Sequence, residues 1–241
     1  MEIFSRIIAL LFLIILSPLL LSIIVLSLLF QGYPIIFKQK RVGKDFKHFN
    51  ILKFRTLKNN TNENDLFTTN FIYEISKWGK FLRKTKLDEL PQLVNIIKGD
   101  MRFIGPRPEI PEYVVREKFI FLNKLKPGLS GYSSILFRNE SEIMSLIDNE
   151  NPYDDILKIK IALDNYYTLK KGFIVDFKLV IITILSLLMP KKAGHYILMK
   201  LLEVENKKEL NLKLILKSVK LKSRDFHFFT LKNDLINSKY K

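Results

Sequence analysis

An apolar run without any charged residue lies near the start of the chain, from Ile7 to Phe30. As a helix it is long enough to cross the roughly 30 Å hydrocarbon core of a bilayer. Ser17 and Pro18 lie near its middle. Pro18 cannot donate a backbone hydrogen bond and its ring clashes with the carbonyl of Ile14, so the pattern predicts a kink there. Ser17 is placed to bond the backbone groups that the kink frees.

The charges that flank this run are positive on both sides. Arg6 precedes it, and Lys38, Lys40, Arg41 and Lys44 follow it. Because Lys and Arg gather on the cytoplasmic side of membrane segments, both ends are expected on that side. A helix broken at Ser17 and Pro18 would enter the membrane and return. An ordinary kinked transmembrane helix is the alternative.

Alternating apolar and polar positions follow, at 33–43 and 46–56. With Gly43 between them, they predict a two-stranded β-hairpin. A polar, Asn-rich loop is expected at 59–65 and a helix at 66–83. Trp78 in that helix is either a core residue or an anchor at the membrane interface.

A helical period returns after this region, with apolar residues at 87, 90, 94, 97 and 101. Gly99 suits the left-handed position that ends such a helix. Further helices are expected at 109–121 and 156–167, and a turn-rich loop at 126–131. The apolar stretch 176–189 is too short to span a membrane and suits a core or interfacial helix.

Composition narrows the classes of function. The 241 residues carry a formal net charge of +16, which indicates an anionic membrane surface, a phosphorylated ligand or nucleic acid as a partner. Nucleic acid is disfavoured because no interleaved basic and aromatic platform is visible. There is no cysteine, which excludes thiol catalysis, and the three histidines are scattered.

Two adjacent carboxylates, Asp88 and Glu89, stand out within a cationic neighbourhood that includes Lys80, Arg83, Lys84 and Lys86 before them and Lys98, Arg102 and Arg107 after them. Thr85 has capping-box spacing to Asp88, which predicts that Asp88 lies in the first turn of an α-helix. There the helix dipole would keep it ionised, as a nucleophile or a metal ligand. The alternative is that the pair only caps the helix.

A second group of residues could contact phosphate. Prolines on either side of Arg107, in the run Gly105-Pro-Arg-Pro108, limit backbone freedom and hold one guanidinium in place. Lys53 and Arg55 are also candidates for a phosphate contact. The alternative is that their side chains only face solvent or lipid headgroups.

The long string from Gly79 to Leu93, together with Lys98-Gly-Asp-Met101 and Gly105-Pro-Arg-Pro108, closely resembles the bacterial sugar transferases known as monotopic phosphoglycosyl transferases. The resemblance extends over about residues 3–189. It implies transfer of a sugar phosphate from a UDP-sugar to the membrane lipid undecaprenyl phosphate, with release of UMP, as the first step of surface-glycan assembly. It also implies a re-entrant membrane helix with a Ser-Pro break.

The resemblance further implies roles for single residues. Asp88 would form a covalent sugar-phosphate intermediate, and Glu89 would bind Mg²⁺, with Mn²⁺ as a substitute. Where the family has an Asn-Gly-Arg segment, this chain reads Arg138-Asn-Glu140, and Arg138 is expected to contact the nucleotide or sugar. Asp164 is either a substrate contact or a structural ion-pair partner.

The expected architecture is α+β and mainly helical. A re-entrant membrane helix at 1–32 precedes a compact catalytic domain at 33–190 that combines interfacial amphipathic helices with a small β-hairpin, and a basic extension of unknown role covers 191–241. The enzyme would lie in the bacterial cytoplasmic membrane with its catalytic domain on the cytoplasmic face, and a homodimer is left open. The competing interpretation is a basic membrane-associated binding protein without activity.

Overall fold

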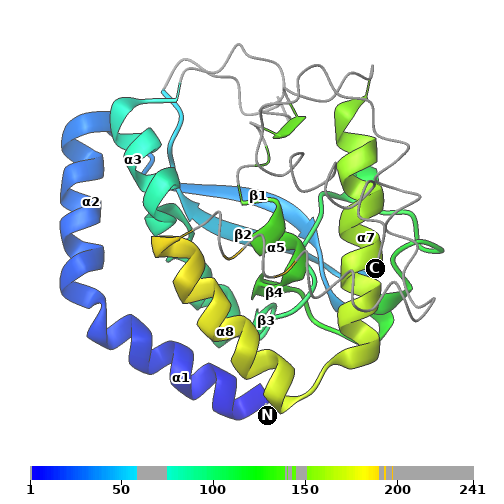
Figure 1. Cartoon of the computed structure of the whole chain (residues 1–241). Coiled ribbons are helices and arrows are strands. Elements are labelled where there is room, and N and C mark those ends of the chain that lie inside the picture. The colour runs from blue at the N-terminus through cyan, green and yellow to red at the C-terminus, as the bar shows by residue number, and fades with distance from the viewer. Residues whose placement is uncertain are drawn as a thin grey trace. The chain divides into compact units, whose positions relative to one another are not determined.

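The computed structural model describes residues 2–58, 75–138, 140, 143–144, 151–189, 193 and 197. Figure 1 shows the helices and strands of the chain. They form two compact units, the first made of residues 1–103 and 108–114 and the second of 104–107 and 115–241. Helices dominate the described residues, with two small two-stranded sheets, so the predicted α+β, mainly helical class is confirmed. The sequence predicts one catalytic domain over residues 33–190, and these bounds stay a prediction.

Two helices joined at a sharp bend begin the first unit. α1 (Glu2–Ile15) and α2 (Ser17–Gln31) meet at 62°. The Ser17 hydroxyl donates to the carbonyl of Ile14 at 2.7 Å, which is the group that Pro18 leaves without its helical partner. The predicted break is therefore confirmed, together with the side chain that satisfies it.

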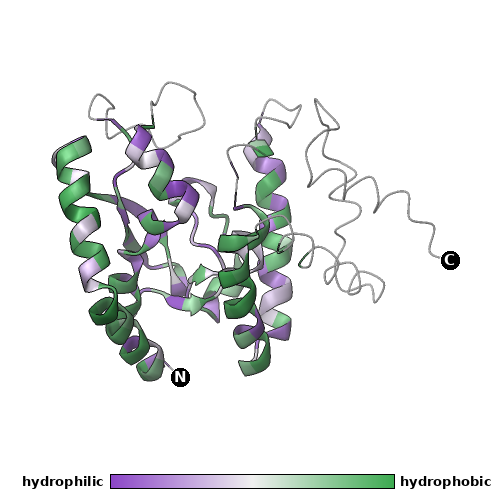
Figure 2. Ribbon diagram, turned by 60° about the vertical axis from the view of Figure 1, so that its left-hand side comes forward, coloured by the Kyte–Doolittle hydropathy of each residue, from purple (hydrophilic) through white to green (hydrophobic). Residues whose placement is uncertain are grey.

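Both helices are hydrophobic along most of their length (Figure 2). Within the described ranges no single helix is long and apolar enough to cross a membrane, and α1 and α2 reach that length only as a bent pair.

The predicted hairpin is also confirmed. β1 (Ile36–Val42) and β2 (His48–Phe54) pair antiparallel, from Ile36 opposite Phe54 to Val42 opposite His48. The short 3-10 helix η1 (Lys44–Phe46) forms the turn, and the Gly43 N–H donates to the Lys47 carbonyl at 2.8 Å.

The single helix expected from Leu87 is divided, which corrects the prediction. α3 (Lys77–Thr85) ends first, the 3-10 helix η2 (Leu87–Glu89) follows, and α4 (Gln92–Lys98) begins after Pro91. Thr85 is the last residue of α3, and its hydroxyl donates to the carbonyls of Phe81 and Leu82 at 2.9 and 3.1 Å, so it caps no helix start. Gly99 ends α4 at φ 87° in the left-handed region, as predicted.

Apolar packing and one buried amide hold these elements together. Ile23 of α2, Phe54 of β2 and Leu82 of α3 form a buried cluster. Asn95 of α4 donates to the Asn50 carbonyl at 2.7 Å and accepts from the Leu52 N–H at 3.0 Å. β2 and α4 are therefore fixed to each other.

The helix predicted over 109–121 is wrong. The described chain there forms η3 (Pro111–Tyr113) and η4 (Ile120–Asn123), and the first unit ends at Val114. Residues 108–114 belong to the first unit because the Val42 N–H donates to the Glu109 carbonyl at 2.9 Å. Pro111 also lacks the N–H that a continuing helix would use.

The second unit begins at Ile104, the last residue of β3 (Arg102–Ile104), which pairs with β4 (Gly128–Ser130). The predicted loop at 126–131 thus contains a strand. Backbones approach closely here, since a Cβ at Gly128 would lie 2.1 Å from the Gly105 nitrogen. α5 (Tyr132–Leu136), α7 (Pro152–Lys170) and α8 (Phe173–Leu188) follow.

α7 confirms the helix predicted at 156–167 with longer bounds, and α8 confirms the one predicted at 176–189. Several exposed apolar side chains lie on α8, among them Phe173, Phe177, Ile184 and Leu188. The predicted loop at 59–65, residues 66–74 of the predicted helix, and almost all of the 191–241 extension lie outside the described residues.

Candidate active site

A left-handed residue directs the chain into the carboxylate pair. After α3, Lys86 takes φ 61° and ψ 16°, and the three residues of η2 follow as a single 3-10 turn. The Glu89 N–H donates to the Lys86 carbonyl at 3.2 Å. This turn buries Asp88, which is 6% exposed.

Glu89 is paired with two lysines. Its Oε1 lies 3.0 Å from Nζ of Lys53 and 3.7 Å from Nζ of Lys86. Lys53 comes from β2, so the hairpin delivers a cation directly to the carboxylate pair. The structure thus brings together three of the predicted site residues, Lys53, Asp88 and Glu89, within the first unit.

Opposing effects act on the Asp88 carboxyl. Burial raises its pKa most strongly, and the Glu89 charge raises it further, while Lys53, Lys86 and Arg83 each lower it. The net direction is upward from the ordinary value. The helix dipole that was expected to keep Asp88 ionised is not available, because η2 is only a three-residue 3-10 turn. The neighbouring cations favour the ionised carboxylate, but they do not offset the effect of burial on its pKa.

One oxygen of Asp88 has no hydrogen-bond partner among the described residues. This atom, Oδ1, is buried. Leaving a buried polar atom unsatisfied costs about 1–3 kcal/mol, and more when the group is charged. Such atoms need an explanation, and a functional role or a missing cation is a common one.

The Asp88–Glu89 pair has the donor atoms of a Mg²⁺ site. The orphaned Asp88 oxygen and the Glu89 carboxylate are hard oxygen donors of the kind that Mg²⁺ prefers. Mg²⁺ usually keeps several waters and takes only one or two carboxylates, so these residues fit it. The described residues contain no group of three or more His, Asp or Glu that could form an all-protein metal cage.

The sequence places Arg83 only in the cationic neighbourhood of the carboxylate pair. The structure places it between Thr56 and Asp88. Its Nε donates to the Thr56 hydroxyl at 2.8 Å, and its charge acts on Asp88. The only feature of the sequence that pointed to Arg83 was its position, slightly more than one helical turn before Asp88. Without knowing where α3 ends, that spacing could not single it out from Lys80 or Lys84.

Arg55 has a structural environment. Its guanidinium donates to the carbonyls of Gln31, Gly32 and Pro34, at the end of α2 and just after it. The residue is 9% exposed. It therefore ties β2 to the end of α2, and its predicted contact with phosphate stays a prediction.

The turn that carries Arg107 is fixed on its far side. Arg41 of β1 donates from Nη1 to the Pro108 carbonyl at 3.1 Å and lies 3.5 Å from the Glu109 carboxylate. Pro108 directly follows Arg107, so these contacts restrict the backbone next to Arg107, whose side chain is half-buried. The predicted rigidity of this turn thus has a second source besides its prolines.

The remaining predicted residues, Arg107, Arg138 and Asp164, belong to the second unit. Nη1 of Arg138 donates to the Ser186 hydroxyl at 3.5 Å. Asp164, 3% exposed, accepts from the Ser133 hydroxyl at 2.8 Å. Lys160 pairs with Glu140 at 2.8 Å, which holds Glu140 to α7. Substrate contacts by Arg107, Arg138 and Asp164 stay predictions.

Comparison with known proteins places these features in context. The sequence model described as "Bacterial sugar transferase" matches residues 1–190. The UDP-N-acetylgalactosamine-undecaprenyl-phosphate N-acetylgalactosaminephosphotransferase of Aeromonas hydrophila is 33% identical over 178 residues, which cover 71% of this chain and 40% of the relative.

Two further relatives match at similar levels. The UDP-glucose:undecaprenyl-phosphate glucose-1-phosphate transferase of Escherichia coli (strain K12) is 34% identical, covering 61% of this chain and 33% of the relative. The uncharacterized sugar transferase EpsL of Bacillus subtilis (strain 168) is 34% identical, covering 65% of this chain and 71% of the relative. The chain spans about two fifths of the length of the Aeromonas hydrophila relative and about one third of the length of the Escherichia coli relative.

Proposed function

The chain belongs to the bacterial sugar transferase family, and we propose that it transfers a sugar 1-phosphate from a UDP-sugar to undecaprenyl phosphate, releasing UMP, through a covalent intermediate on Asp88. The two relatives named for their reactions are both sugar-phosphate transferases that act on undecaprenyl phosphate. Their names support the reaction type. Because the two names give different sugars, the sugar of the UDP-sugar donor of this chain must be determined by experiment.

The observation that carries the proposal is the state of Asp88. It is a buried carboxylate with one unpartnered oxygen, surrounded by Lys53, Lys86 and Arg83. A purely structural aspartate would use both oxygens in hydrogen bonds or ion pairs. A nucleophile must instead keep an oxygen that is not engaged in a hydrogen bond, so that it can bond to the reacting atom when substrate binds.

In the first step an Asp88 carboxylate oxygen attacks the phosphorus that bears the sugar. The bond between that phosphorus and the oxygen bridging to UMP breaks, and UMP leaves with the electron pair. In the second step an oxygen of undecaprenyl phosphate attacks the same phosphorus, and the Asp88 carboxylate leaves. Dividing the transfer into two displacements is what covalent catalysis provides.

Charge is the main obstacle, because the nucleophile and both substrates are anionic. Lys53, Lys86 and Arg83 offset this repulsion in the first unit. Their effect is enhanced where burial excludes water. Arg107 is proposed to add a bidentate phosphate contact from the rigid Pro-Arg-Pro turn. Arg138 and Asp164 are proposed as contacts for the nucleotide or sugar.

A bound Mg²⁺, or Mn²⁺ in its place, would be held by Glu89 and would neutralise charge on the diphosphate of the donor. Lys53 orients the Glu89 carboxylate through the 3.0 Å ion pair. Glu89 and Asp88 would therefore have separate tasks, one in binding the cation and one in bond formation.

The apolar bent pair α1–α2 is proposed to insert into the cytoplasmic membrane as a re-entrant hairpin. The 62° bend and the Ser17–Ile14 hydrogen bond support an insertion that returns to the same face. This arrangement would hold the catalytic residues at the height of the acceptor phosphate. The transfer would then start assembly of a surface glycan.

The second candidate is a basic membrane-associated protein without activity. The positive charge and the apolar helices fit this function equally well. Lipid binding, however, requires neither a buried Asp88 beside Glu89 nor an Asp88 oxygen that has no partner among the described residues. The enzyme is therefore favoured.

UMP release tests the proposal. Purified protein in detergent is given a panel of UDP-sugars, Mg²⁺ and undecaprenyl phosphate. We expect release with one or two sugars, a loss of at least about a thousandfold in Asp88→Asn, and a loss in excess chelator. Asp45→Asn, at an exposed position of the hairpin turn, is the matched control and should retain activity. Full activity of Asp88→Asn would sink the assignment.

A further inference from the structure

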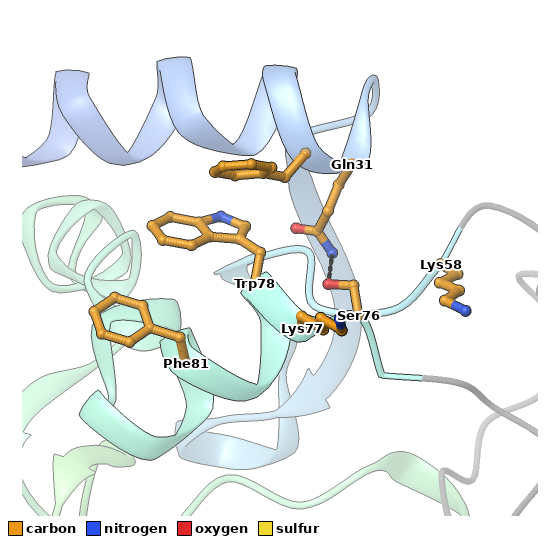
Figure 3. A pocket seen from close by; sticks show the side chains of 7 residues that line it. Gln31, Lys58, Ser76, Lys77, Trp78 and Phe81 are labelled. Carbon is orange, nitrogen blue, oxygen red and sulfur yellow. Dashed lines mark hydrogen bonds between the residues drawn. The ribbon is translucent and has the colours of Figure 1, made fainter.

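The turn η2, which carries the carboxylate pair, is held through the helices on both sides of it. On the upstream side, α3 is attached to α2. The Gln31 amide nitrogen donates to the Ser76 hydroxyl at 2.8 Å, and the Trp78 indole N–H donates to the Ser27 hydroxyl at 2.9 Å. Figure 3 shows Gln31, Ser76 and Trp78 along the pocket that they help to line. On the downstream side only residues 90–91 separate η2 from α4, so the attachment of α4 also fixes η2.

One side chain of α4 attaches that helix to β2. The Asn95 amide nitrogen donates to the Asn50 carbonyl at 2.7 Å, and the amide oxygen accepts from the Leu52 N–H at 3.0 Å. Residues along an antiparallel strand alternate between bonding the partner strand and pointing away from it, so these two groups belong to the edge of β2 that is turned away from β1. The amide therefore bonds β2 as one residue of a third strand would.

Asn95 is itself firmly held. It is 1% exposed, and its backbone carbonyl accepts from the N–H groups of Gly99 and Asp100 at 3.1 and 3.0 Å, in the turn that ends α4. An amide side chain offers a donor and an acceptor side by side, which is what a C=O and an N–H of the same strand edge require. A buried polar group that is satisfied in this way specifies one arrangement of the elements around it.

The residue that follows this anchor on β2 is Lys53. Its Nζ lies 3.0 Å from Oε1 of Glu89, and the backbone directly before it is held by Asn95. Successive side chains of a strand point to opposite faces, so a slip of β2 by one residue would turn Lys53 away from Glu89. Burial raises the pKa of the Asp88 carboxyl, and Lys53 opposes that rise. The position of Lys53 therefore affects both carboxylates.

We propose that Asn95 is a positioning residue of the transferase, whose amide sets β2 against α4 so that Lys53 reaches Glu89 beside Asp88. Asn95 contacts no reacting atom and acts through Lys53. The inference rests on the proposed function and adds to it a residue outside the carboxylate pair and the phosphate contacts. An Asn95 with only a structural role would stabilise the fold without controlling Lys53 in particular.

The position of Lys53 is measured without any substrate. Protein in detergent is labelled briefly with acetic anhydride, and the modification of each lysine is followed by peptide mass spectrometry. An amine beside a carboxylate keeps its proton and reacts slowly. Asn95→Leu, which is branched like Asn but forms no hydrogen bond, should raise the modification of Lys53 about tenfold. Lys86, which pairs with Glu89 within η2, should change less than about twofold.

Two further variants control for folding. Ile96→Val changes the neighbouring residue of α4, which is 0% exposed, and leaves the Asn95 amide in place. It should lower Tm and leave the modification of Lys53 unchanged. If Asn95→Leu does not unfold cooperatively, Asn95→Asp replaces it. This variant keeps the acceptor for the Leu52 N–H and loses the donor to the Asn50 carbonyl, and it should raise the modification of Lys53 about threefold.

A double-mutant cycle measures the consequence for UMP release. Asn95→Leu should lower the rate by about tenfold to a hundredfold in the natural background. In a Lys53→Met background the same substitution should cost less than about threefold, because two residues that act through one contact have non-additive effects. A general loss of stability would cost the same factor in both backgrounds.

Two results would overturn the proposal. Unchanged modification of Lys53 in a folded Asn95 variant would show that β2 holds this lysine without the amide. Equal factors in the two backgrounds of the cycle would show that Asn95 acts on the fold alone. Because the labelling needs no substrate, it tests the position of Lys53 even if the natural protein releases no UMP, a result that would count against the proposed function instead.

Discussion

Asp88 combines burial, three nearby cations and an oxygen that nothing in the described part of the chain satisfies. The sequence predicted the pair Asp88–Glu89 and the cation Lys53, because their residue types and the surrounding string were distinctive. It could not predict that Lys53 contacts Glu89 at 3.0 Å, since that contact depends on how β2 packs against η2. The predicted cap at Thr85 failed because its hydroxyl bonds back into α3.

The raised pKa of Asp88 has a consequence for stability. The folded protein holds the Asp88 proton more tightly than the unfolded chain, whose carboxyl has the ordinary pKa of 3.8. Ionisation therefore disfavours the fold, and stability is lost as pH rises from 3.8 through the raised folded pKa. Asp88→Asn, which never ionises, should be more stable than the natural protein at neutral pH.

This is checked by thermal unfolding in excess chelator from pH 3.5 to 7.5. The difference in Tm between Asp88→Asn and the natural protein should shrink as pH falls toward 3.8. Asp45→Asn provides the exposed control and should show no such trend. A difference that does not change with pH would contradict the burial effect on this carboxyl.

At the scale of elements, hydropathy and alternation predicted the bent apolar segment, the β1–β2 hairpin, α7 and α8. These patterns are local, and a proline break or a strand pair is visible within a short window. The region from Leu87 to Phe121 was misjudged, because η2, η3 and the division between units depend on distant partners. Glu109, for example, is held by β1 rather than by helical neighbours.

The hydrogen bonds of Arg55 make a prediction about the junction of α2 and β2. Its fork reaches three carbonyls at and just beyond the end of α2, and a lysine cannot reproduce that geometry. Arg55→Lys should lower the free energy of unfolding by about 1–3 kcal/mol, because partly buried carbonyls lose hydrogen bonds from a charged donor. Denaturant titration measures this.

Arg116→Lys, at an exposed position, is the matched control for Arg55→Lys and should change stability little. If the two substitutions had equal effects, the clamp on the end of α2 would not contribute to stability.

At the scale of the whole molecule, the proposed re-entrant hairpin predicts one membrane topology. Both ends of α1–α2 would face the cytoplasm, since Arg6 and the lysines of β1 flank the apolar pair. Tags placed at residue 1 and at residue 241 should both be protected from a membrane-impermeant reagent in intact cells. Both should react after permeabilisation.

Replacing Ser17 and Pro18 together with leucine should restore helical hydrogen bonding through the break and permit a span, exposing one end. An N-terminus that is labelled from outside in the natural protein would instead replace the hairpin with a transmembrane helix.

The central claim is that Asp88 carries the sugar phosphate between donor and acceptor. The most direct measurement omits the acceptor, supplies the UDP-sugar that supports UMP release, and analyses the protein by intact and peptide mass spectrometry. We predict one added sugar phosphate per chain, located on the peptide that contains Asp88, and its loss when undecaprenyl phosphate is added. UMP release without any adduct, or an adduct that persists in Asp88→Asn, would contradict the account.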